Sequence, residues 1–179
     1  MTEAAVRRLV WMLVVICGLG ATASSPRGQG TRAAGCEAPP FRALDFWLGA
    51  WDVRTKQDEQ AGASVVEAAA DGCSVLERWT SVPGMPRFAG IGLHTYDPAT
   101  KTYRQIWSDT RPAVVDMRGV PLNDGFRYEW KITSPAGRLL DKRYTLTQTD
   151  GGGVRQLGEQ SADGGKTWVV EYEYRYRRH

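Results

Sequence analysis

The chain has 179 residues, of which 42% are hydrophobic and 24% are charged, and it carries a net charge of +3. This composition is that of a folded globular protein, and the length suits one ordinary domain with a sizeable core. The basic residues are dispersed except for the run RYRRH at residues 175–179, a short tail of the kind that water usually solvates. The sequence therefore lacks the basic stripe typical of nucleic-acid-binding proteins, and we expect no nucleic-acid partner.

The first residues have the order of a secretory signal peptide. Arg7 and Arg8 precede an apolar run from Leu9 to Ala21, and small residues follow up to Ala23. The run is shorter than the about 20 residues that a membrane-spanning helix needs, so an uncleaved anchor is the less favoured alternative. We expect a signal peptide over residues 1–23, a flexible leader over 24–40 and a folded domain over 41–179, located in the periplasm or secreted, with no membrane span after cleavage.

Two cysteines remain after the predicted cleavage, Cys36 and Cys73. In an exported chain an even pair of cysteines favours a disulfide, with two free thiols as the alternative. The disulfide would tie the segment before the first strand to the body of the domain. Metal binding is disfavoured because His94 and His179 are the only histidines, which leaves too few ligands. We expect no metal and no cofactor.

From Phe41 onward, polar and apolar residues alternate with period two, as in GFRYEWKIT (125–133) and WVVEYEYRYRR (168–178). This alternation is typical of half-buried antiparallel strands, and turn signals such as Asp124-Gly125 separate the runs. The sequence predicts an all-β fold, an antiparallel up-and-down barrel of about ten strands, with a two-sheet sandwich as the alternative. The strands are expected to start near residues 46, 62, 74, 88, 101, 113, 125, 138, 153 and 166.

The stretch SADGGKTW at residues 161–168 predicts a tight hairpin turn. Asp163 is expected to accept hydrogen bonds from backbone amides, and Gly164 and Gly165 tolerate positive φ angles. Trp168 is then expected to pack inward. The stretch also matches a hairpin of sialidase propellers, but a single copy in so short a chain argues against a propeller.

The stretch FWLGAWDV at residues 46–53 places two tryptophans around one glycine at the start of the first predicted strand. Its G-A-W sequence resembles the G-x-W signature of lipocalins and the wider calycin group, in which the tryptophan plugs one end of the barrel. The resemblance implies that an arginine of the last strand covers the tryptophan ring in a cation–π contact. The residues given structural roles on this basis are Gly49, Trp51 and an arginine, Arg175 or Arg177, with Arg178 also placed to serve.

Further motifs extend the resemblance over nearly the whole domain. They are LDFWLGAWDV (44–53), GCSVLERW (72–79), YDPATKTYRQIWSD (96–109), RQLGEQSADGGKTW (155–168) and the ending YRYRR (174–178). Together they are similar to a family of small bacterial proteins of unknown function often called DUF1579. The resemblance implies a calycin-like barrel and an export signal, and it implies no activity. Gly158, where a bulkier residue is common, is expected to widen the cavity.

Some strand residues are more polar than a plain core requires. Glu77 shares a strand face with Trp79, and Gln105 shares one with Trp107. If these faces point inward, aromatic walls with a few polar groups form a small-molecule site. The alternative is that Glu77 forms a structural ion pair with Arg155 or Arg78. The residues predicted to bind the ligand are Glu77, Trp79, Tyr96, Tyr103, Gln105, Trp107 and Arg155.

Two residues are candidates for acid–base catalysis. Glu77 in an aromatic pocket would have a raised pKa, and His94 is the second candidate. Triads, phosphate loops and metal clusters are absent from the sequence. The favoured function is binding of a small apolar or amphipathic molecule in the barrel. The alternatives are a barrel-cavity enzyme of isomerase or cyclase type that uses Glu77 or His94, and a filled barrel that acts as a structural or interaction protein.

Overall fold

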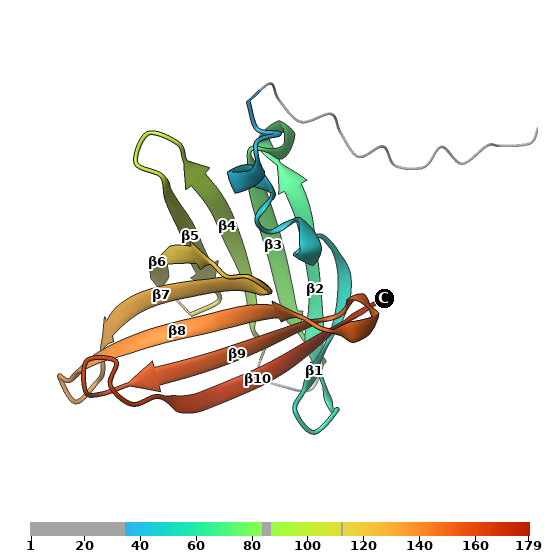
Figure 1. Cartoon of the computed structure of the whole chain (residues 1–179). Helices are drawn as coiled ribbons and strands as arrows, with labels where there is room; N and C mark the ends of the chain where they lie inside the picture. The colour runs from blue at the N-terminus through green and yellow to red at the C-terminus, as the bar shows by residue number, and fades with distance from the viewer. Residues whose placement is uncertain (1–34, 84–86, 112) are drawn as a thin grey trace, which may run out of the picture.

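The computed structural model describes residues 35–83, 87–111 and 113–179. Within them the chain forms a closed antiparallel barrel in which each strand pairs with the next and the last strand pairs with the first (Figure 1). The predicted all-β up-and-down barrel is confirmed, and the sandwich alternative is wrong. The signal peptide predicted for residues 1–23 and the first part of the predicted leader, residues 24–34, lie outside the described residues.

Ten strands make the wall, and each begins within about three residues of its predicted start. The stretch VVEAAADG (65–72), which has helical propensity, continues a strand and then ends in a turn. The strands are β1 (Gly49–Thr55), β2 (Gln60–Ala69), β3 (Ser74–Ser81), β4 (Ala89–Asp97), β5 (Thr102–Asp109), β6 (Val114–Pro121), β7 (Gly125–Thr133), β8 (Leu139–Gln148), β9 (Val154–Ser161) and β10 (Val169–Arg178).

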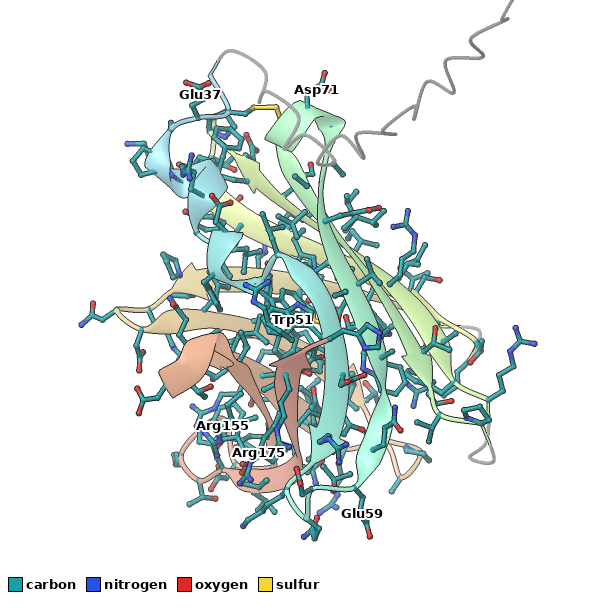
Figure 2. The ribbon with its side chains drawn as sticks, turned by 90° about the vertical axis from the view of Figure 1, so that its right-hand side faces the viewer. Glu37, Trp51, Glu59, Asp71, Arg155 and Arg175 are labelled. Carbon is teal, nitrogen blue, oxygen red and sulfur yellow. A yellow bond between two sulfur atoms is a disulfide. The ribbon has the colours of Figure 1, made fainter. Side chains whose placement is uncertain are left out.

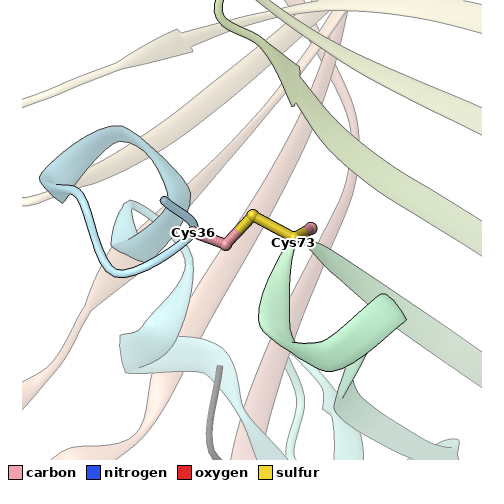
Figure 3. The surroundings of a disulfide bond; sticks show 2 residues. All are labelled: Cys36 and Cys73. Atoms are coloured by element: carbon pink, nitrogen blue, oxygen red, sulfur yellow. A yellow bond between two sulfur atoms is a disulfide. The ribbon is translucent and has the colours of Figure 1, made fainter. Parts of the chain in front are cut away.

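Short 3-10 turns and a disulfide close one end of the barrel. The turns η1 (Pro39–Arg42) and η2 (Asp45–Trp47) lead into β1, whereas η3 (Ala70–Gly72) and η4 (Asp150–Gly152) connect strands. Cys36 and Cys73 form the predicted disulfide, which joins the segment before η1 to the start of β3 (Figure 3). The last residues of the predicted flexible leader are therefore fixed: they carry the disulfide and the beginning of η1.

Trp47 and Trp51 fill this closed end, with exposed fractions of 0% and 1%. The indole nitrogen of Trp51 donates to the backbone oxygen of Trp47 at 2.8 Å. Arg178 covers the Trp51 ring, with its guanidinium carbon 4.6 Å from the ring centroid. The prediction that Arg175 or Arg177 covers the Trp51 ring is therefore wrong. Trp51 pairs with Arg178 in the register between β1 and β10, so residues at odd distance from Arg178 lie on the other face of the sheet.

The turn at residues 161–168 is only partly as expected. Asp163 accepts hydrogen bonds from the hydroxyl group of Thr167 and from the amides of Thr167 and Lys166, and these bonds, above all that of the hydroxyl group, lower the pKa of its carboxyl group to about 2. Trp168, however, does not pack inward: it lies on the outer wall under the guanidinium of Arg143, 3.9 Å from the ring centroid. A register shift after Val170 interrupts the alternation of β10, so the residues before it change face.

Candidate functional site

Glu77 lies in the middle of the barrel interior, with an exposed fraction of 3%. Ser64 of the neighbouring strand β2, which lies opposite Trp79 in the register, donates a hydrogen bond to Oε1 of Glu77 at 2.9 Å. Burial raises the pKa of Glu77 to about 7, although the contacts of its carboxyl group with the hydroxyl groups of Ser64 and Tyr176 act in the opposite direction. A carboxyl group with this pKa exchanges a proton near neutral pH, as a general acid or base must.

No lysine or arginine in the described part of the chain forms an ion pair with Glu77, so the structural ion pair suggested by the sequence is wrong. Arg78 pairs instead with Glu67 on the outer wall. Arg155 also lies outside and pairs with Glu173 at 2.9 Å, so it does not contribute to the predicted ligand site. The strand alternation explains both results, because Arg78 follows an inward residue and Arg155 precedes the buried Gln156.

Tyrosine hydroxyl groups surround the carboxyl group of Glu77. Tyr176 donates to Oε1 of Gln156 at 2.8 Å, and Tyr144 donates to Oε1 of Gln105. Burial raises the pKa of both tyrosines well above the usual range, and the charge of Glu77 raises it further. The hydroxyl groups therefore stay protonated, and Glu77 is the group in this layer that titrates near neutral pH.

Aromatic rings line the inner wall toward the turns that follow β3 and β5, and we call this the aromatic end. Phe88 contacts the rings of Trp79 and Trp107, with centroids 5.3 and 6.4 Å apart. Trp107 lies flat on β4, where a Cβ atom added to Gly90 would come within 2.2 Å of its ring. The structure thus brings together the predicted residues Trp79 and Trp107, and it adds partly exposed rings that the sequence did not select: Phe88, Trp130, Tyr172 and Tyr174.

Gly158 does not widen the interior. A Cβ atom at this position would lie 2.1 Å from the ring of Tyr172, which occupies the space above the glycine. The missing side chain therefore makes room for a tyrosine of the neighbouring strand β10. The signal was present in the sequence, since glycines in strands often mark close approach by another group, but the partner could not be read from it.

His94 belongs to the closed end and lies beneath η1 and η2. Its Nδ1 is 2.9 Å from the hydroxyl oxygen of Tyr128, and its ring meets that of Trp47 edge-on. Burial lowers the pKa of His94 to about 3, so the imidazole is neutral at physiological pH. Its Nε2 has no hydrogen-bond partner among the described residues. A histidine that is neutral and enclosed in this way cannot exchange protons with a ligand at the aromatic end.

Tyr96 and Tyr103 also lie at the closed end, where their ring centroids are 4.7 Å apart. Together with Phe41 and His94 they line a cavity of about 20 Å³, which has room for about one water molecule. The predicted ligand site therefore divides in two. Glu77, Gln105, Trp79 and Trp107 lie in the middle and at the aromatic end, whereas Tyr96 and Tyr103 lie at the closed end.

The described residues hold no group of three or more metal-binding side chains, and none of their helices has the length and apolar character needed to cross a bilayer. Comparison with protein-family models and with curated proteins finds no match for this chain. The structure is a closed barrel. Its interior holds the buried carboxyl group of Glu77, whose pKa is near neutral pH, below a partly exposed aromatic wall.

Proposed function

We propose that this chain is an exported barrel that binds a small apolar or amphipathic molecule at the aromatic end. The observation that carries the proposal is the position of Glu77, a buried carboxyl group without an ion-pair partner among the described residues, beneath partly exposed rings. An apolar wall with a few placed polar groups is the usual composition of a small-molecule site. In this proposal the rings bind the apolar part of the ligand and Glu77 binds a polar group.

The disulfide supports the location. Disulfides persist in oxidising compartments, and the Cys36–Cys73 pair suits a periplasmic or secreted protein. Export through a signal peptide at residues 1–23, and kinship with the DUF1579 proteins, remain part of the same proposal. N-terminal sequencing of the exported protein tests the cleavage after residue 23.

The test of binding uses N-phenyl-1-naphthylamine, a neutral apolar dye that fluoresces in dry sites. We expect saturable dye fluorescence and quenching of the protein's tryptophan emission. Trp107→Ala should weaken dye binding at least tenfold, whereas Trp168→Ala, which removes a tryptophan of the outer wall, should leave it within twofold. Equal affinities for the two variants would contradict the proposal. Native mass spectrometry of protein from its own host identifies a retained ligand.

A second candidate function, a barrel-cavity enzyme of isomerase or cyclase type, is favoured by the pKa of about 7 at Glu77. The same carboxyl group would then move a proton on the bound molecule. Incubation with metabolite extracts of the host distinguishes the two functions. A binding protein leaves the mass spectrum and retention times unchanged, whereas an enzyme converts a component, and Glu77→Gln abolishes the conversion.

A further inference from the structure

The barrel closure aligns three arginines on its outer wall. Arg175 of β10 lies directly opposite Arg54 of β1 and directly opposite Arg155 of β9. Neighbouring strands are about 4.8 Å apart, so the row extends over about 10 Å. Figure 2 shows Arg155 and Arg175 together on the lower part of the barrel. Like charges placed directly opposite one another destabilise a sheet, so this row needs compensating anions.

The carboxylates near the row compensate it only in part. Glu173 lies 2.9 Å from Arg155 and 3.6 Å from Arg175, and therefore serves two arginines at once. Asp58 is likewise shared, at 2.7 Å from Arg177 and 4.0 Å from Arg54. Among the described residues, the ion pairs of these four guanidinium groups use two carboxylates, while Asp52 lies opposite Arg177 in the register and the charge of Glu159 also reaches Arg155. The side chain of Arg175 remains 45% exposed, and its ion pair with Glu173 is longer than that of Arg155.

The row borders an open depression of about 550 Å³ beside η4. Cations outnumber anions in its lining, and the charge of Lys56 also reaches Glu173. The depression is formed by β9, β10 and the glycine-rich turn, and so it is separate from the aromatic end. Its charged lining residues are Arg155, Arg175, Arg177, Arg178, Glu173 and Asp150.

We propose that this arginine row and the depression beside it bind a phosphate-bearing ligand with at least two anionic groups. The planar guanidinium fork matches phosphate oxygens, and charge-assisted hydrogen bonds of this kind are the strong ones. A diphosphate is long enough to reach two neighbouring arginines, and its charge offsets the repulsion within the row. The inference is independent of ligand binding inside the barrel.

The test measures binding of inorganic pyrophosphate by titration calorimetry at low ionic strength. The wild type should bind it saturably, and Arg175→Gln should weaken binding at least tenfold. Arg78→Gln is the matched control, because it removes the same charge from an exposed ion pair elsewhere on the outer wall and should change the affinity less than twofold. Equal weakening by both variants would mean that only net charge matters, and would overturn the proposal.

Thermal unfolding provides a second readout. Without anion, Arg175→Gln should melt at the same temperature as the wild type or higher, because it relieves repulsion. With pyrophosphate, the melting temperature should rise in the wild type and not in the variant. A large drop in the melting temperature of the anion-free variant would show that the row is a structural network with Glu173, and would overturn the proposal. Arg54→Gln, which removes another arginine of the row and leaves the contacts of Glu173 in place, should give the same two results.

The phosphate can be free or part of a lipid headgroup, and sedimentation with vesicles of phosphatidylglycerol distinguishes the two sources. Binding of pyrophosphate without sedimentation assigns a soluble ligand. Sedimentation that Arg175→Gln abolishes and Arg78→Gln preserves assigns a lipid phosphate. Absence of both kinds of binding in the wild type would overturn the proposal.

Discussion

At the closed end of the barrel Trp47 and Trp51 are completely enclosed, whereas at the aromatic end Trp107 stays partly exposed beside Phe88. Trp51 donates to a backbone oxygen within the core, whereas Trp107 donates to Asp109, whose carboxylate also pairs with Arg111. The closed end thus has the properties of a folding core, whereas the aromatic end leaves part of its ring surface accessible to solvent. The residue type alone does not distinguish these roles.

Glu77 and His94 are both buried, and their pKa values shift in opposite directions. Burial is the largest cause of the pKa shift at both Glu77 and His94, yet it raises the pKa of the acid to about 7 and lowers that of the base to about 3. In each case burial favours the neutral form, because the interior cannot solvate a charge. The two residues therefore affect the pH dependence of stability in opposite directions.

The largest effect is expected from Trp51→Ala. Truncation of a buried tryptophan commonly costs about 3–5 kcal/mol, through lost transfer free energy and the cavity that remains. Trp107→Ala should cost clearly less, because Trp107 is already partly exposed. Urea unfolding of both variants measures the difference. Similar losses would show that the two ends are equally part of the core.

Glu77→Gln should stabilise the protein at alkaline pH. The folded-state pKa of about 7 lies above the usual value of 4.5 for a glutamate, so the folded protein binds more protons than the unfolded chain between these two pH values. Stability is therefore lost as the pH rises through this window, by roughly 3 kcal/mol at pH 8. The glutamine variant, which stays neutral, should be more stable than the wild type by about this amount at pH 8 and equal to it near pH 4.

The control for this measurement is Glu67→Gln. Glu67 is an exposed acid of the outer wall, and its ion pair with Arg78 contributes little. Its loss should therefore change stability by less than about 1 kcal/mol at either pH. If Glu77→Gln were instead strongly destabilising at pH 8, the carboxylate would be held by a partner, and the near-neutral pKa would be wrong.

His94 should make the free energy of unfolding fall as the pH is lowered, which is opposite to the effect of Glu77. Its pKa is about 3 in the folded protein and 6.5 in the reference state, so the unfolded chain binds a proton first as the pH falls. In the Glu77→Gln background the free energy of unfolding should be about 2 kcal/mol lower at pH 5 than at pH 7.5. A flat profile would contradict the neutral, buried state of His94.

The strand pattern and turn residues were sufficient to predict the barrel, because alternation determines which residues face the interior and turn chemistry determines where strands end. The inward positions of Glu77, Trp79, Gln105 and Trp107 follow from the same rule. The prediction failed where alternation is interrupted, as at Trp168, where the register shift of β10 moves the ring to the outer wall.

The division of the site could not be predicted, because alternation gives the face of a residue and not its height in the barrel. Tyr103 and Trp107 share the inner face of β5, but they lie one near each end. The arginine row was missed for a related reason. Arg54 and Arg155 are far apart in sequence, and only the closing register of β1, β10 and β9 places them beside Arg175. The tail that the sequence marked as simply solvated therefore includes part of a charged surface.

The smallest loss of stability is expected when the arginine that covers the Trp51 ring is replaced. Arg178 lies over the ring and donates to the backbone oxygen of Leu48 at 3.1 Å. Arg178→Gln should therefore cost about 1 kcal/mol, the value of a cation–π contact at a surface. Arg177→Gln is the matched control, because its side chain faces the other side of the sheet and pairs with the exposed Asp58. It should cost less, since exposed ion pairs contribute little.

A substitution at Gly49 also tests the contact between Arg178 and Trp51. Its φ angle is +147°, and a Cβ atom there would lie 2.5 Å from Nη1 of Arg178. Gly49→Ala therefore introduces backbone strain and also displaces the guanidinium group from the ring of Trp51. Because both substitutions remove the same contact, the double variant with Arg178→Gln should lose less stability than the sum of the single losses. Strict additivity in this double-mutant cycle would mean that Arg178 does not stabilise Trp51.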